Sequence, residues 1–222
     1  MEELELVNRD LVAFCDLVCL ALEESIKGIS GWDMAHEKEV IALHRRINQQ
    51  FLAIEENCMG LIARQQPIAS DLRFVICSLE TARRLERCGD YAFEIARTAM
   101  LLKPRIRVGM EELLEMEKTA SEALRMATRG FASKDHGIAS EAFRLEGEND
   151  AQFKLLISKL KAHMAKNTGG ADLALRTFAI GHYYERTADY AERIARSLGY
   201  VTKADRKYLL DYGNKAAARK KR

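Results

Sequence analysis

The sequence has few of the residues and patterns that interrupt helices or build sheets. Only two of its 222 residues are proline, and no stretch alternates apolar and polar residues for long enough to predict a strand. Charged residues make up 31% of the chain and aromatic residues 7%, a composition that favours helices. A chain of this length with 48% hydrophobic residues can bury a sizeable core. We therefore expect an all-α protein.

The cysteines form no recognisable zinc or disulfide pattern. There is no C-x-x-C pair, which argues against a zinc ribbon, and an odd count argues against a closed disulfide framework. All five cysteines stand among apolar neighbours, where reduced thiols behave as small hydrophobic side chains; they are Cys15, Cys19, Cys58, Cys77 and Cys88. This pattern indicates a reducing compartment.

The chain also has no long hydrophobic run. Its most apolar stretch, Leu11 to Leu22, contains Asp16 and is too short to span a bilayer. Nothing at the N-terminus resembles a signal peptide. We expect a soluble, cytoplasmic protein.

Motifs of the common enzyme classes are missing as well. Gly169-Gly170 lacks the Lys-Ser/Thr that would follow in a phosphate-binding loop. Catalytic di-iron bundles use Glu-x-x-His on facing helices, and the nearest pattern here is Asp33-x-x-His36, which falls at a predicted helix start. We expect the other histidines at 136, 163 and 182 to lie on the surface or to pack. These features predict that the protein is not an enzyme.

The net charge of +2 is small, but it is unevenly distributed. From Lys203 onward eight basic residues stand against two acidic ones. We interpret 203–222 as a basic, solvated tail; contact with acidic lipid, a partner or nucleic acid is the alternative. Three tyrosines on the last predicted helix, at 183, 184 and 190, are expected to pack against neighbouring helices rather than to stack on bases. No nucleic-acid partner is therefore expected.

An internal repeat organises the chain. Residues 86–97 read ERCGDYAFEIAR, and 185–196 read ERTADYAERIAR, in the same register. In each copy a Glu and an Asp lie four residues apart, so they are neighbours on one helix face and repel by about 0.2–0.5 kcal/mol. Both acids lie in line with the apolar stripe of the helix. Two like charges beside a core need an Arg or Lys, a proton or a metal as compensation.

Apolar spacing and helix breakers predict six helices in two sets of three. The Gly28–Gly31 segment should end the first helix, Asp33 could cap the second, and Ser70 or Asp71 should cap the third. Two pseudo-symmetric three-helix bundles are expected, over 1–104 and 105–202. The predicted helices cover approximately 2–27, 33–63, 70–102, 109–133, 135–166 and 172–201.

Pairs of polar residues four apart on the middle helix of each half suggest partners for the repeated acids. Glu146 and Asp150 would join Glu185 and Asp189 to place four carboxylates in one groove. Such hard oxygen ligands suit iron, manganese, magnesium or calcium. The first half offers His44 and Asn48 beside Glu86 and Asp90, a set of lower charge and therefore a weaker site. Alternatively, the acids pair with nearby arginines at 83, 84, 87 or 186.

These residues resemble the PhoU family of phosphate-transport regulatory proteins over about residues 4–202. The carriers are the two Glu-Arg-x-Gly/Ala-Asp-x-Ala segments and a Gln-Pro-x-x-x-Asp-Leu-Arg element. The Gln-Pro-x-x-x-Asp-Leu-Arg element contains Gln66, Pro67, Asp71 and Arg73.

The resemblance implies two three-helix bundles, each able to bind a multinuclear iron or zinc cluster. Residue by residue, the ligand positions are Glu146, Asp150, Glu185 and Asp189 in the second bundle. In the first bundle they are Glu86 and Asp90, with His44 and Asn48 where the family usually has acids. Asn48 is a poor replacement for a bridging carboxylate.

The resemblance also implies a regulatory function. Such proteins couple the phosphate ABC transporter ATPase to a membrane sensor histidine kinase, and they repress the starvation response when phosphate is plentiful. A peripheral position at the membrane and a homodimer are expected. The alternatives are an accessory protein of another phosphate permease, a carboxylate-bridged metalloenzyme, and a purely structural helical adaptor with solvated acids.

Overall fold

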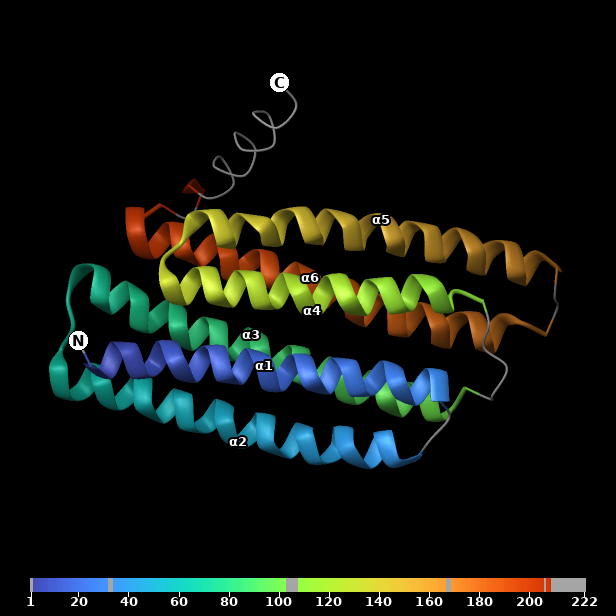
Figure 1. The fold of residues 1–222 in the computed structure, drawn as a ribbon, viewed down its shortest axis with the longest axis horizontal. Helices are drawn as coiled ribbons and strands as arrows, with labels where there is room; N and C mark the ends of the chain where they lie inside the picture. Colours follow the sequence, from blue (N-terminus) through green and yellow to red (C-terminus); the bar gives the residue numbers. More distant parts are fainter. Residues whose placement is uncertain (1, 32–33, 103–107, 167–168, 206, 209–222) are drawn as a thin grey trace, which may run out of the picture.

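The computed structural model describes residues 2–31, 34–102, 108–166, 169–205 and 207–208. Over this part it consists of six long helices and contains no strand (Figure 1). The helices are α1 (Glu2–Gly31), α2 (Met34–Gln65), α3 (Ala69–Met100), α4 (Met110–Ser133), α5 (His136–Lys166) and α6 (Ala171–Lys203). The prediction of an all-α fold is confirmed.

The helices form two three-helix bundles that lie side by side. Helices α1, α2 and α3 pack on one another, as do α4, α5 and α6. The bundles meet where α1 packs on α4 and α3 packs on α6. Consequently α2 and α5 lie on the outer sides of the molecule (Figure 1).

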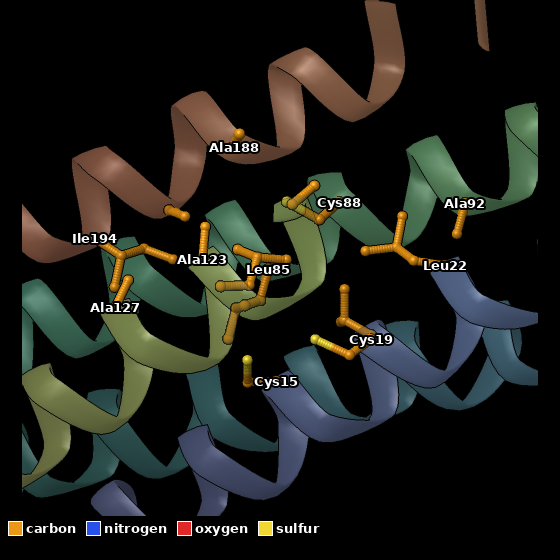
Figure 2. Close-up of a cluster of buried hydrophobic side chains, with 14 of the residues drawn as sticks. Cys15, Cys19, Leu22, Leu85, Cys88, Ala92, Ala123, Ala127, Ala188 and Ile194 are labelled. Atoms are coloured by element: carbon orange, nitrogen blue, oxygen red, sulfur yellow. The ribbon is translucent and has the colours of Figure 1, made fainter. Parts of the chain in front are cut away.

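A single hydrophobic core runs through both bundles. Figure 2 shows its centre, where side chains from α1, α3, α4 and α6 meet. Small residues such as Cys88, Ala123 and Ala188 are almost fully buried there, which lets the four helices approach closely. All five cysteines are buried and free, as the sequence predicts.

Most helix ends fall near the breakers in the sequence, with some corrections. Helix α1 continues through the Gly28–Gly31 segment instead of ending before it. Asp135 caps α5, since its Oδ1 accepts a hydrogen bond of 3.0 Å from the Ile138 backbone N–H. The predicted cap at Asp33 and the Lys103-Pro104 break lie outside the described residues.

The predicted cap of α3 is wrong. The residue at the N-cap position is Ile68, whose side chain makes no capping hydrogen bond. The chain enters the helix through a turn that contains two residues with left-handed backbone conformation. Gln66 has φ 47° and Ala69 has φ 50°, a conformation that non-glycine residues adopt rarely. Arg73, one turn into α3, donates a hydrogen bond of 3.2 Å to the Val201 carbonyl and so ties this end of α3 to α6.

No described helix combines the length and apolarity that crossing a membrane requires. The basic tail prediction falls almost wholly on residues outside the described part of the chain.

Candidate metal centres

In the second bundle, acidic side chains of α5 and α6 lie along the line where the two helices pack, which we call the second groove. Glu146 and Asp150 lie one turn apart on α5, and Glu185 and Asp189 one turn apart on α6. All four are partly exposed. The charge of Asp150 and Asp189 acts on Glu146, and that of Asp150 acts on Glu185. The sequence-predicted set of four therefore shares one electrostatic environment.

Glu146 carries the clearest sign of uncompensated negative charge. Partial burial, followed by the charges of Glu192, Asp150 and Asp189, raises the pKa of Glu146 to about 7. Arg196 opposes this rise but is itself bound to Glu192 over 2.5 Å. A proton or another cation is therefore bound more readily at Glu146 than at an ordinary carboxylate.

Glu192 is a fifth acid of the groove that the sequence comparison missed. On α6 it lies one turn beyond Asp189 and two turns beyond Glu185, on the same helix face. At the equivalent position of the first repeat the chain has Phe93, so a search for residues shared by both copies passes over it. The spacing 185, 189, 192 on one helix face was the available signal.

Glu185 has one oxygen that lacks a hydrogen bond. Its Oε2 atom is buried without a hydrogen-bond partner among the described residues, and the nearest cationic candidate is His182 Nδ1 at 3.3 Å. Burial, and then the charge of Asp189, raises the pKa of Glu185, while His182 and Arg186 oppose that rise. An unbonded buried carboxylate oxygen is a suitable donor atom for a cation.

Two acids of the groove already have basic partners. Asp189 Oδ2 accepts a hydrogen bond of 2.8 Å from Arg186, and Asp150 lies 3.5 Å from Lys154 in an exposed pair. The alternative prediction, that arginines compensate the acids, is therefore confirmed for Arg186.

The first bundle differs because two basic side chains bind both oxygens of its aspartate. His44 Nε2 lies 3.0 Å from Asp90 Oδ1, and Arg87 donates to Asp90 Oδ2 over 2.8 Å. The His44 ring also stacks on Phe93, with centroids 4.8 Å apart. Burial, and then the charge of Asp90, raises the pKa of Glu86. This site has two acids and two basic groups.

Asn48 lies one turn beyond His44 on α2, partly exposed. Of the other arginines weighed as partners, Arg83 pairs with Glu55 and Arg84 with Glu80. They contribute nothing to Asp90 through direct pairing.

The Gln-Pro element lies far from both carboxylate sites. Arg73 and Glu86 are on the same helix, about 20 Å apart at about 1.5 Å per residue. Gln66 and Asp71 are exposed at the turn into α3, and Pro67 is partly exposed. The Arg73 guanidinium also lies 6.0 Å from the Tyr200 ring centroid. This element joins the start of α3 to the end of α6 and does not line the metal-ligand positions.

In the described residues, no three or more His, Cys, Asp or Glu side chains converge closely enough to hold an ion as they stand. The donor atoms of the second groove nevertheless fit a hard cation, because they are carboxylate oxygens. One of them, on Glu185, is buried and makes no hydrogen bond, and the pKa values of Glu146 and Glu185 are raised. Side-chain rotation would be needed to bring the oxygens together. The first site fits less well because Asp90 is already bound on both oxygens.

Two segments of the chain, residues 11–99 and 113–198, match the family described as PhoU domain. The chain belongs to the PhoU family. Each match covers one of the two bundles, so the repeat in the sequence corresponds to a repeat of the domain.

Named members of the PhoU family match this chain over nearly its full length. The phosphate-specific transport system accessory protein PhoU of Escherichia coli (strain K12) is 27% identical over 204 residues, covering 90% of this chain and 84% of the relative. The PhoU homolog of Pseudomonas aeruginosa is 28% identical over 206 residues, covering 90% and 84%.

Solved structures agree with the family assignment. The crystal structure of PhoU from Pseudomonas aeruginosa superposes with a TM-score of 0.85 at 27% identity, covering 92% of this chain and 99% of that one. The phosphate transport system regulatory protein PhoU from Streptococcus pneumoniae gives a TM-score of 0.82 at 25% identity, covering 91% and 96%.

Proposed function

We propose that this protein is an accessory and regulatory protein of phosphate uptake that acts by binding rather than by turnover. The observation that carries the proposal is the match to phosphate-transport accessory proteins over 90% of the chain. The long, mostly exposed outer faces of α2 and α5 offer helical surfaces for partners.

More specifically, the proposed partners are the ATPase of the phosphate ABC transporter and the phosphate sensor histidine kinase. The protein binds them as a homodimer, peripherally at the cytoplasmic face of the membrane, and represses the starvation response when phosphate is plentiful. The family assignment supports this model, since its named members belong to the phosphate-specific transport system.

A cation site in the second bundle is part of the proposal. Glu146, Asp150, Glu185 and Asp189 would hold an iron or zinc cluster, with Glu192 as a further carboxylate. Bound there, the metal would supply fixed positive charge that holds α5 and α6 together. The first site, at Glu86, Asp90, His44 and Asn48, is the weaker candidate because His44 and Arg87 already bind Asp90.

The regulatory function is tested in cells and with purified protein. Deleting the gene should switch on a phosphate-starvation reporter in phosphate-rich medium, and the intact gene should restore repression. The purified chain should bind the transporter ATPase or the kinase at physiological salt. A silent reporter together with no binding to either protein would overturn the proposal.

The metal site has its own test. Protein purified without chelator is compared with Glu185→Gln/Asp189→Asn, and metal content is measured by mass spectrometry. We expect the metal of the wild-type protein to be lost in the double variant. If both proteins are metal-free after incubation with iron, zinc or manganese, the carboxylates form a solvated groove.

An accessory protein of another phosphate permease would show the same fold, and binding to that permease instead of the ABC transporter would identify it. A carboxylate-bridged metalloenzyme is the remaining alternative. Phosphatase activity that disappears in Asp189→Ala would support it.

A further inference from the structure

Tyrosine and arginine side chains gather where α3 crosses α6, between the two carboxylate sites. Tyr91 and Tyr190 occupy equivalent repeat positions, and their rings stack with centroids 6.1 Å apart. Tyr183 also stacks on Tyr91, with ring centroids 5.3 Å apart. The two copies of the repeat therefore meet at this tyrosine pair.

Each tyrosine of the pair has the arginine of its own repeat beside it. The Arg87 guanidinium lies 5.9 Å from the Tyr91 ring centroid, and the Arg186 guanidinium lies 5.6 Å from the Tyr190 ring centroid. Arg186 also interacts with the Tyr91 hydroxyl across the crossing. A third guanidinium, from the exposed Arg193, lies 5.5 Å from the Tyr190 ring centroid. Three guanidinium groups and two hydroxyl groups thus lie around one crossing.

The arginines of the two repeats are also the partners of the metal-ligand aspartates. Arg87 binds Asp90 and Arg186 binds Asp189, each over 2.8 Å. Both arginines reach solvent, with side chains that are 55% and 31% exposed. Their donors are therefore occupied by intramolecular acids but are accessible from outside.

We propose that Arg87, Arg186, Arg193 and the hydroxyls of Tyr91 and Tyr190 form a binding site for a phosphate-type oxyanion, which opens when a cation takes Asp90 and Asp189 away from the arginines. Guanidinium groups bind tetrahedral oxyanions through paired, charge-assisted hydrogen bonds, and tyrosine hydroxyls add donors. The coupling rests on the proposed metal centres. The oxyanion site itself does not, since any loss of the aspartate charge frees the same donors.

The charge balance explains why the site should be closed without metal. Asp90 and Asp189 neutralise two of the three guanidinium groups. The first repeat has no arginine equivalent to Arg193, because that position is Glu94, which pairs with Arg97 over 3.6 Å. A cation bound by the aspartates leaves Arg87 and Arg186 without their aspartate partners, so the neighbouring Glu86 and Glu185 are the remaining carboxylates that act on them. By thermodynamic reciprocity, bound phosphate then strengthens binding of the cation.

The test measures binding of inorganic phosphate by calorimetry to the full chain in chelator. Asp90→Asn/Asp189→Asn removes the competing charges without any metal, so phosphate cannot bind by coordinating an ion. We expect this variant to bind phosphate at least about tenfold more tightly than the metal-free wild type. Adding Arg87→Gln/Arg186→Gln should abolish the gain. Arg83→Gln, an exposed arginine on α3 paired with Glu55, is the matched control and should leave it unchanged.

A second arm uses the wild type loaded with micromolar manganese, which should gain a similar affinity for phosphate. Phenyl phosphate replaces phosphate in parallel: equal binding shows that phosphoryl groups on other molecules are ligands, and no binding restricts the site to the free anion. No gain in Asp90→Asn/Asp189→Asn, or a gain that survives the arginine changes, overturns the site. If manganese loads without raising phosphate affinity, the coupling is wrong. If neither manganese nor iron or zinc loads but the asparagine variant binds phosphate, the metal proposal fails and the oxyanion site stands.

Discussion

His44 Nε2 lies 3.0 Å from Asp90 Oδ1 and occupies one of the two oxygens that the first repeat offers to a metal. The second bundle has Glu146 on the facing helix instead, and its groove carries five carboxylates. The two halves share a backbone arrangement but differ in charge, and this difference leads to the first prediction.

Replacing the first-bundle side chains with acids should create a stronger cation site there. In His44→Glu/Asn48→Asp the imidazole is gone, and two carboxylates face Glu86 and Asp90, so we expect more metal per chain than in the wild type. Mass spectrometry of the purified protein measures this ratio. His44→Gln, which removes the ring without adding charge, is the control. An unchanged ratio in the acidic variant would contradict the prediction.

The raised pKa of Glu146, about 7, predicts that the metal-free protein is less stable at high pH. In the unfolded chain a glutamate has a pKa of about 4.3. Between these values the folded state binds more protons, so the free energy of unfolding falls as pH rises from about 4.3 to about 7. Because the side chain is partly exposed, we expect Glu146→Gln to stabilise by only about 1 kcal/mol at pH 8 and to change little at pH 4.

Urea denaturation in chelator at both pH values tests this expectation. The exposed Glu56 of α2, changed to Gln, serves as the control and should show no such pH-dependent difference from the wild type. Equal stabilisation of the Glu146 variant at pH 4 and pH 8 would show that the side chain acts through packing and not through its charge.

A buried hydrogen bond joins the bundles. The Ser25 hydroxyl of α1 and the Tyr184 hydroxyl of α6 are 3.2 Å apart, both residues fully buried. Tyr184→Phe should cost about 1 kcal/mol, because Ser25 keeps its bond to the Leu22 carbonyl. Ser25→Ala leaves the tyrosine hydroxyl without this partner and should cost more. The double variant should lose less than the sum of the two, as measured by chemical denaturation. Strict additivity would rule out the coupling.

Two glycines of the second bundle should respond in opposite directions to alanine. A Cβ on Gly130 of α4 would overlap the Ala139 backbone of α5, whereas one on Gly147 meets nothing within 4 Å. Gly130→Ala should destabilise by about 1–3 kcal/mol because the helices must separate. Gly147→Ala, on an exposed helix face, should stabilise by about 0.5–1 kcal/mol. Thermal melting distinguishes them, and similar effects at both positions would refute the close α4–α5 approach.

The sequence predicts the helices well because each carries a regular apolar stripe and most end near a Gly or Pro signal. Helices α4 and α6 end instead at the C-caps Lys134 and Ala204, both with left-handed backbone conformation. It could not predict the entry into α3. There the turn places Gln66 and Ala69 at positive φ, no side chain caps the helix, and a long-range hydrogen bond from Arg73 to the Val201 carbonyl ties the start of α3 to α6. A tertiary contact across 128 residues has no local signature.

The carboxylates of the second groove could be found by spacing, but their pairing could not. Whether Asp189 binds Arg186 or an ion depends on side-chain rotamers, and three residues of separation permit either. Glu192 escaped because the comparison of repeats retains only what both copies share.

The continuous core has a consequence for the two halves considered as separate chains. Each half carries an apolar face on its first and third helices that the other half covers. A single repeat expressed alone would expose this face and, because the halves are pseudo-symmetric, could cover it with a second copy of itself in an isologous dimer. The two-bundle chain then corresponds to such a dimer made covalent, which left each copy free to change its acids independently.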